Sequence, residues 1–371
     1  MWKTRKTREL TERRAKEEAE AQAAALRASI TNDVMAQVRD LLSLVPTTAD
    51  GVPNLSALKI AVRNIDIVQM NIKHFGYDLA RKVADALPIR KGTAAGHVGL
   101  QTKLSTQTDM ESDWVAHWCS QLHIPVIMHR KLWELSYVLQ AIFENGHMRD
   151  GARGLGFGCG EEPLPSYLAA RGVAVTVTDL GADEAYEKGW ATTGQHTASL
   201  DKAYHPALVD RATFDRLVGI ETVDMTAIPD HLRDYDFCWS VCALEHLGSI
   251  AKGMAFIENS LETLRPGGIA VHTTEFNIAS DGPTIDNWPT VLFQGQHFVA
   301  LADRLRAQGH DVAELNFDVG DKPLDRFIDV PPFDPAAEFG NWHRRSAHLK
   351  LAIDGFPCTC VGIVVRKAAP A

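Results

Sequence analysis

The sequence predicts an α/β fold in which a doubly wound, mostly parallel sheet follows an N-terminal helical extension. From residue 152 to the C-terminus, short apolar runs typical of strands alternate with helical patterns at regular spacing, as in a parallel sheet. A glycine-rich turn at 154–160 joins the first predicted strand, 152–157, to a predicted helix, 164–170. Such a turn lets the backbone approach a ligand, and the helix points its N-terminal amides at the same place.

The composition limits the partners and the location of the protein. The chain has 371 residues, enough for two domains, a formal net charge of −9, and six cysteines without a C-x-x-C pair. This acidic balance argues against a nucleic-acid partner, which needs a basic surface. The sequence has no long apolar run and no secretory segment, so we expect a reduced, cytoplasmic protein without a membrane span.

Residues 1–97 are expected to form the helical extension. The first 25 residues are rich in charged residues and alanine and have little to bury, so they are expected to be frayed or exposed. Apolar residues then recur at spacings of three and four over 26–45 and 55–87, which predicts two amphipathic helices. Two interpretations of this unit remain open: an αα-hairpin that packs onto the next domain, and an interface of a homo-oligomer.

The glycine spacing and the acids that follow it indicate the ligand of the turn. The turn reads Gly156-x-Gly158-x-Gly160 and continues into Glu161 and Glu162, which does not match the dinucleotide pattern G-x-G-x-x-G. Two carboxylates would repel a pyrophosphate. S-adenosylmethionine fits better, because it carries a sulfonium and an ammonium and has no phosphate. The alternative is a plain strand–helix turn with incidental glycines.

Acidic residues follow the next two predicted strands. Asp179 lies about 20 residues past the glycines, where an acid holds a ribose diol. Asp224 is suited to accept a hydrogen bond from an adenine amine. The strands predicted after the turn are 173–178, 220–223, 235–241, 269–274, 311–317 and 359–365.

The chain resembles the class I S-adenosylmethionine-dependent methyltransferases. The resemblance lies in the glycine turn, the two acids Asp179 and Asp224, the strand into Glu245-His246, and the Leu-Arg-Pro-Gly-Gly stretch at 264–268, all in the family's order. It implies a Rossmann-like sheet of seven strands over residues 98–371, whose last two strands form a hairpin. It also implies S-adenosylmethionine as the cofactor.

One position departs from the family's pattern. The family usually has an acid two residues before the first glycine of the turn, where this chain has Gly154, so Glu161 is the substitute candidate for holding the methionine ammonium. The cofactor contacts implied by the resemblance are Gly156, Phe157, Gly158, Gly160, Glu161, Asp179, Leu180, Asp224, Met225, Ser240, Val241 and Cys242.

Two segments are expected to shape an acceptor pocket. In many proteins of this family the segment before the first strand lies over the cofactor mouth, so residues 100–148, with helices at 110–119 and 127–143, are expected to form a helical cap. A long connection at 318–356 precedes the last strand, and long ordered loops are usually functional. The expected acceptor contacts are Trp114, His129, Arg130, Asn277 and His348.

Catalysis is expected at the carboxyl ends of the fourth and fifth strands, the ligand side of such a sheet. An oxygen nucleophile needs a proton acceptor, and the candidates are His246 and Glu275, with Glu245 beside them. A structural role for His246 is the alternative. A divalent ion held by these three residues is conceivable, but no ligand-spaced motif supports it, and no metal is expected.

The acceptor is suggested by resemblance alone. From about residue 98 onward the chain is similar to bacterial methyltransferases associated with polysaccharides or secondary metabolites, through stretches such as 105–109, 129–134, 242–247 and 272–277. This resemblance implies O-methylation of a sugar or glycan hydroxyl. The alternatives are O- or N-methylation of another small molecule and a non-catalytic scaffold that binds S-adenosylmethionine.

Overall fold

The computed structural model describes residues 47–52, 54–88, 94–159, 161–180, 200–279, 282–333 and 347–369. The charged stretch 1–25 and the helix predicted at 26–45 lie outside these ranges. Contacts divide the chain into two units, 1–72 and 73–371. The second predicted helix is confirmed as α2, Leu55–Ala86, which crosses the boundary between the units.

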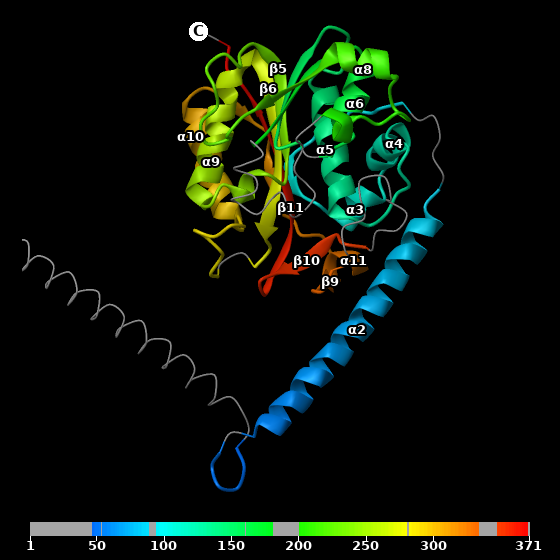
Figure 1. The fold of residues 1–371 in the computed structure, drawn as a ribbon, viewed down its shortest axis with the longest axis vertical. Coiled ribbons are helices and arrows are strands. Elements are labelled where there is room, and N and C mark those ends of the chain that lie inside the picture. The colour runs from blue at the N-terminus through cyan, green and yellow to red at the C-terminus, as the bar shows by residue number, and fades with distance from the viewer. Residues whose placement is uncertain are drawn as a thin grey trace, which may run out of the picture. The chain divides into compact units, whose positions relative to one another are not determined.

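The centre of the second unit is the predicted sheet (Figure 1). Its strands run in the order β4-β3-β2-β5-β6-β11. The first five are parallel to one another, and β11 is antiparallel to β6. The chain order therefore reverses between β2 and β5, which is the switch point where doubly wound sheets bind ligands. The bounds are β2 Arg153–Phe157, β3 Ala174–Asp179, β4 Val218–Thr222, β5 Tyr235–Val241, β6 Leu264–Asn277 and β11 Phe356–Arg366.

Three short strands, β1 (Thr102–Leu104), β7 (Asp311–Val312) and β10 (Lys350–Ile353), pair with β11 on the side away from β6. The sequence predicted this part of the sheet only in part. The single strand predicted at 311–317 is two, β7 and β8 (Leu315–Asn316). The segment 100–148, expected to form a helical cap, also contains a strand, β1, which pairs with the middle of β11. The backbone of β1 fills the ladder between the pairings of β11 with β7 and with β10. A further strand, β9 (Ile328–Asp329), pairs with β10.

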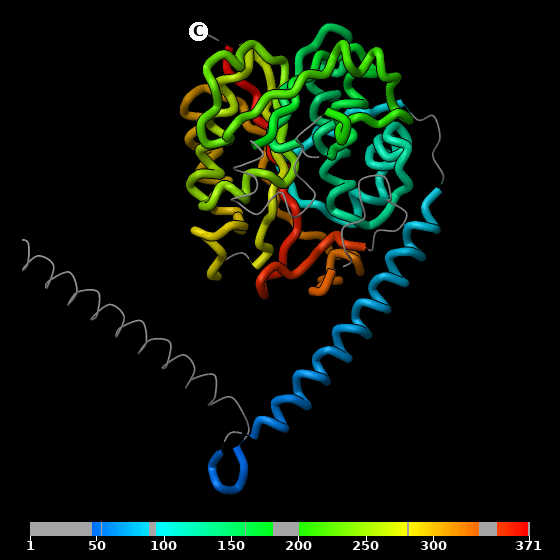
Figure 2. Tube along the Cα trace, viewed as in Figure 1, coloured from blue at the N-terminus to red at the C-terminus, as the bar shows by residue number. Residues whose placement is uncertain are grey.

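Helices cover both faces of the sheet (Figure 1, Figure 2). One group packs over Phe237 and Trp239 of β5, and the other packs over Phe157 of β2 and Phe276 of β6. The first group is α4 (Asp113–Gln121), α5 (Arg130–Glu144), α6 (Leu164–Ala169) and α8 (Arg211–Leu217), and the second is α9 (Ile250–Ser260) and α10 (Gly295–Ala307). Shorter helices and turns are α3 (Gln107–Met110), α11 (Pro323–Arg326), η2 (Leu200–Ala203), η3 (Leu244–His246) and η4 (Leu261–Thr263).

Helix α5 begins three residues later than predicted and carries a charged residue into the core. The His129 imidazole caps it by accepting a hydrogen bond from the Lys131 amide (3.1 Å). Capping groups of this kind satisfy amides that have no partner within the helix. Every residue from Leu132 to Ile142 is buried, including Glu134, which is fully buried. A charge buried in this way needs partners, and α5 lies against β5, β6 and β11, which supply them.

The C-terminal part of α2 packs against the connection before β10. Lys73 Nζ lies 3.3 Å from Asp329 Oδ1, and the Tyr77 hydroxyl donates to the same oxygen (2.9 Å). Gly76 lies directly against the Phe327 ring, where a larger side chain would collide. Among the described helices, none is long and apolar enough to cross a membrane.

Candidate active site

The turn after β2 needs its glycines. Gly158 has φ +59°, a conformation that L side chains rarely adopt, and a Cβ there would lie 2.8 Å from Ala243 Cβ. A Cβ on Gly156 would collide with Cys159 and lie 2.5 Å from the Trp239 ring. The turn therefore passes closely under the end of β5. The third glycine of the motif, Gly160, lies outside the described residues.

The two predicted acids lie at the same edge of the sheet as the turn. Asp179 is the last residue of β3, and its Oδ1 accepts a hydrogen bond from the Leu180 amide (2.8 Å). Asp224 follows β4 and accepts from the amide (2.7 Å) and hydroxyl of Thr226. Met225 is buried, with its sulfur beside Gly158. The residues expected to hold ribose and adenine are thus gathered at the carboxyl ends of β2, β3 and β4.

The two glutamates of the turn have different environments. Glu161 forms an ion pair with Lys202 (2.8 Å). Glu162 is 4% exposed and accepts a hydrogen bond from Trp239 Nε1 (3.1 Å). Burial raises the pKa of Glu162 to about 8, although the hydrogen bond favours the ionised form. Sequence reasoning chose Glu161, because nothing in two adjacent glutamates shows which one turns inward.

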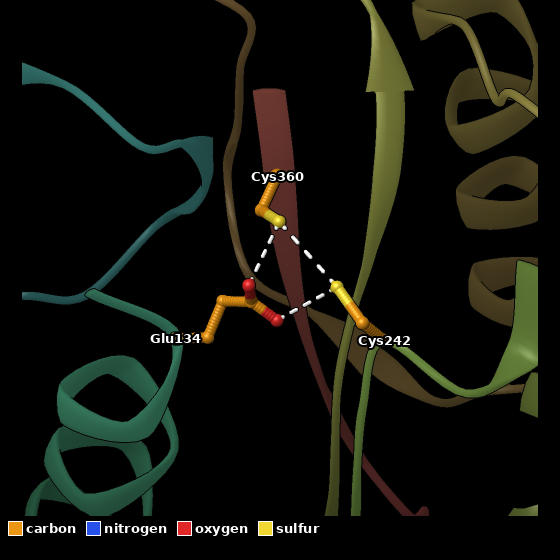
Figure 3. Close-up of side chains that lie close together, drawn as sticks. All are labelled: Glu134, Cys242 and Cys360. Atoms are coloured by element: carbon orange, nitrogen blue, oxygen red, sulfur yellow. Dashed lines mark hydrogen bonds between the residues drawn. The ribbon is translucent and has the colours of Figure 1, made fainter. Parts of the chain in front are cut away.

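A buried polar cluster lies where α5 meets the end of β5 and the middle of β11 (Figure 3). The Cys242 thiol lies 2.8 Å from one carboxylate oxygen of Glu134, and the Cys360 thiol lies 2.9 Å from the other. The two sulfurs are 3.5 Å apart. Thr273 Oγ1 also donates to Glu134 (2.7 Å). Sequence reasoning missed Glu134 and Cys360, which only the packing of α5 on the sheet brings together.

Arg130 occupies the centre of this cluster. Its Nη1 lies 3.2 Å from Glu134 Oε1 and 3.2 to 3.3 Å from both sulfurs, and its Nη2 lies 2.6 Å from Glu275 Oε1. Burial opposes ionisation of Glu134, but Lys131 and Arg130 outweigh it and hold the Glu134 pKa below its usual range. The guanidinium therefore has the position that a metal ion would take among Glu134, Cys242 and Cys360.

Glu245 and Glu275 form the next part of the site. Glu245 comes from η3, just after β5, and Glu275 from β6, and both are buried. One ligand atom from each lies within 4.8 Å of the other and of the Cys242 sulfur. Glu245 Oε1 and Glu275 Oε2 are among the few buried side-chain atoms of the described residues without a hydrogen-bond partner. Burial raises the pKa of Glu275 to about 7, and it also raises the pKa of Glu245.

His246 lies beside this pair but is held by other groups. Its Nδ1 lies 3.1 Å from the Pro289 carbonyl oxygen and 3.2 Å from Thr290 Oγ1. Its Nε2 lies 3.8 Å from Glu245 Oε1, too far for a hydrogen bond. Burial lowers the pKa of His246 to about 4. The imidazole is therefore neutral at physiological pH and only weakly basic.

Two of the predicted acceptor contacts meet at the start of α5. The rings of His129 and His348 have centroids 5.3 Å apart, and His348 Nδ1 lies 2.7 Å from Asp329 Oδ2. His348 also accepts a backbone hydrogen bond from Arg130 (3.1 Å). His348 is thus brought to His129 and Arg130, from which it is far apart in the sequence, and Arg130 links this group to Glu275.

The other predicted contacts lie further inside the fold. Trp114 is 8% exposed and belongs to the core around α4 and α5. Asn277 donates to the Pro283 carbonyl and accepts from the Ala279 amide, so it holds the chain after β6. Ser240 lies 2.8 Å from His272, whose ring packs against Phe256 of α9, on the face of the sheet away from Glu134. Their roles as ligand contacts remain predictions.

Comparison with known proteins yields only distant structural matches. No family model and no curated protein matches the chain. Among solved structures, an S-adenosylmethionine-dependent methyltransferase from Methanosarcina mazei has 14% identity and a TM-score of 0.37, covering 62% of this chain and 98% of that one. One from Mesorhizobium loti has 15% identity and a TM-score of 0.34, covering 61% and 96%.

A third similar structure is phosphoethanolamine N-methyltransferase 2 from Haemonchus contortus, in complex with S-adenosylmethionine. It has 18% identity and a TM-score of 0.32, covering 47% of this chain and 37% of that one. The strand order of the sheet and the place of its glycine turn decide the assignment. The chain has a Rossmann-like, doubly wound fold.

The predicted site residues lie at one edge of this sheet, and their roles remain predictions. The glycine turn, Asp179 and Asp224 lie on one side, and Glu245, His246 and Glu275 lie after β5 and on β6. The cluster around Arg130, which was predicted only in part, lies beside the second group and contacts it through Glu275. It supplies charge and buried hydrogen-bonding groups at the point where β5, β6 and α5 meet.

Proposed function

We propose that the protein is an S-adenosylmethionine-dependent methyltransferase that methylates a hydroxyl group of a sugar or glycan, with Glu275 as the general base. The observation that carries the proposal is the buried Glu275 carboxylate, whose Oε2 has no hydrogen-bond partner. An unpartnered buried oxygen is costly unless a ligand supplies a donor. It lies at the ligand edge of a sheet whose glycine turn is built for close backbone approach.

The residues at the other end of the site fit the cofactor. Gly156 and Gly158 have no room for a Cβ, because the turn packs against Trp239 and Ala243, and such a tight glycine turn supports the proposed position of the cofactor. Asp179 is placed to accept hydrogen bonds from the ribose diol, and Asp224 from the adenine amine. Glu162 is the inward-facing carboxyl group of the turn, and we assign it to the methionine ammonium. No phosphate-binding group is needed.

The proposed reaction is an in-line displacement. S-adenosylmethionine, when bound, supplies a methyl group on a positively charged sulfur. The new bond forms between the acceptor oxygen and the methyl carbon, while the carbon–sulfur bond breaks and its electron pair stays on sulfur. Glu275 Oε2 takes the hydroxyl proton, and Arg130 holds the other oxygen of Glu275 in place.

Glu275 suits the role of base better than His246. A general base works best when its pKa lies near the working pH. Burial brings the pKa of Glu275 up to about 7, whereas burial takes the pKa of His246 down to about 4. The Nδ1 of His246 is also engaged with a backbone carbonyl. We therefore assign His246 to positioning of the η3 turn and Glu275 to proton transfer.

A transfer assay tests the function. The full-length chain is incubated with S-adenosylmethionine that carries a labelled methyl group and with a panel of glycosides, sugar nucleotides, phenols and amines. We expect label in a glycoside or sugar nucleotide, at a hydroxyl oxygen. Label in an amine alone would favour the alternative of a small-molecule N-methyltransferase. S-adenosylhomocysteine binding without transfer to any acceptor would favour the non-catalytic scaffold.

We also propose that α2 mediates self-association. Leu58, Ala61, Ile65, Val68 and Ile72 recur at alternating spacings of three and four, the pattern of a coiled-coil seam. The four larger side chains are 39% to 56% exposed. The positions beside this seam are Ala57, Val62, Asn64 and Gln69, all uncharged, so two copies of α2 can approach without like-charge repulsion. A second copy of this chain is therefore the expected partner.

A further inference from the structure

The proposed reaction leaves one buried acid without a role. Glu245 is fully buried, and its Oε2 accepts a hydrogen bond from Thr274 Oγ1 (2.9 Å), while its Oε1 has no hydrogen-bond partner. Glu275 has the same arrangement, with Oε1 paired to Arg130 and Oε2 unpartnered. Each carboxyl group is thus held in place through one oxygen, and its other oxygen is left to bind a ligand.

The two acids lie close enough to contact the same ligand. One oxygen of each lies within 4.8 Å of the other. Burying a polar oxygen without a partner costs free energy, and two neighbouring carboxyl groups that each leave one oxygen unpartnered indicate a ligand with two hydrogen-bond donors. Two kinds of acceptor meet this requirement: a molecule with neighbouring hydroxyl groups, and an ammonium group whose N–H bonds point to both oxygens.

Charge decides between them. Arg130 lies 2.6 Å from Glu275, and Lys131 lies 3.7 Å from Glu134, so two cations already face the three acids of the site. One ionised acid besides Glu134 balances these cations, which leaves the other acid of the pair neutral. An ammonium would bring a third positive charge close to Arg130 and Lys131 and would be repelled by both. A neutral diol adds two donors and no charge.

We infer that the acceptor presents two adjacent hydroxyl groups, one to Glu275 Oε2, where it is methylated, and the other to Glu245 Oε1, where it is only bound. This inference rests on the proposed function and narrows its substrate class to vicinal diols. Glu275 takes the proton of the first hydroxyl as its oxygen receives the methyl group. The second hydroxyl keeps its proton, donates it as a hydrogen bond to Glu245, and sets which oxygen meets the methyl carbon.

The test compares a methyl hexoside with its monodeoxy forms, using the full-length chain and saturating S-adenosylmethionine. For the wild type, removal of the hydroxyl next to the methylated one should lower kcat/KM about 10- to 100-fold, because Glu245 Oε1 is then left buried without a hydrogen-bond partner. Glu245→Met, which keeps similar bulk without the oxygens, should lower kcat/KM on the parent hexoside by a similar factor. The kcat/KM of this variant should then be the same on the parent hexoside and on the deoxy sugar that lacks the second hydroxyl.

Glu258→Met is the matched control, because Glu258 lies on α9, where it pairs with Arg304 (2.8 Å), outside the site. It should respond to deoxygenation like the wild type. The inference would be overturned if the fold-losses in kcat/KM caused by Glu245→Met and by deoxygenation multiply when the two changes are combined. If Glu245→Met does not fold, the wild type alone still tests the inference. Equal wild-type rates on the parent hexoside and on every deoxy form that keeps the target hydroxyl would overturn the inference and would leave the proposed function standing. Transfer to no member of the series would overturn both.

Discussion

Replacing Glu275 by glutamine probes the proposed chemistry most sharply. Glutamine keeps the shape of the side chain, and its amide oxygen can still accept a hydrogen bond from Arg130 Nη2, which lies 2.6 Å from Glu275 Oε1. Only the capacity to take a proton is lost. General-base catalysis contributes about 10²–10⁴-fold, so kcat should fall by that factor, equivalent to about 3–5 kcal/mol of barrier. Affinity for S-adenosylhomocysteine should stay near the wild-type value.

The pH profile adds a second observable to the same experiment. Glu275 must be ionised to accept a proton, so wild-type kcat/KM should fall as the pH drops through about 7, the pKa to which burial raises this carboxyl group. An exposed glutamate would place the same fall near pH 4.3. The acid limb should disappear in Glu275→Gln, because no proton acceptor remains to titrate.

His246→Gln is the control at the neighbouring position. His246 Nε2 lies 3.8 Å from Glu245 Oε1, and burial lowers the pKa of His246 to about 4. Loss of the imidazole should therefore change kcat by no more than a few-fold. The assay is initial-rate transfer of a labelled methyl group, with calorimetry to confirm cofactor binding. The reasoning is refuted if Glu275→Gln stays within a few-fold of wild type, or if His246→Gln shows the larger loss.

Three further predictions concern the cofactor and the assembly. Asp179→Ala should weaken S-adenosylhomocysteine binding by about 1–3 kcal/mol in calorimetry, through loss of charge-assisted hydrogen bonds to the ribose, and an unchanged affinity would show that Asp179 does not contact it. Gly158→Ala should abolish binding, because φ +59° and the 2.8 Å approach to Ala243 leave no space for a Cβ; retained binding would contradict the placement of the turn. Light scattering should show Ile65→Lys to be monomeric, while Ile67→Lys, equally exposed (56%) but outside the seam, keeps the wild-type oligomer; equal behaviour of the two variants would argue against self-association through α2.

The sequence predicted the sheet well because strand signals are local. Apolar runs of four to seven residues with turn residues at their ends placed β2, β3, β4 and β5 within two residues of their observed bounds. The glycine turn was equally visible, since a positive φ at Gly158 and close packing under β5 leave few choices of residue. The three residues of β1 are too few to show a strand pattern in the sequence. They form a strand because they pair with backbone groups of β11.

The centre of the site could not be predicted in the same way. Glu134 is one acid in an amphipathic helix, and its burial depends on α5 lying over β5, β6 and β11. Cys360 had the pattern of a buried apolar residue, which it is, and its contact with Glu134 exists only in the folded chain. The pKa values that separate Glu275 from His246 also arise from burial, which the sequence does not show.

Calorimetry with the full-length chain tests the central claim most directly. S-adenosylhomocysteine and NAD are titrated separately into the protein, because both carry an adenosine that a glycine turn and two acids can accept, and they differ in the pyrophosphate. S-adenosylhomocysteine carries the ammonium that Glu162 is assigned to hold, and it should bind with one site per chain. NAD has no such ammonium, and its pyrophosphate would lie next to the Glu161 carboxylate, so it should not bind. Binding of NAD without binding of S-adenosylhomocysteine would contradict the account.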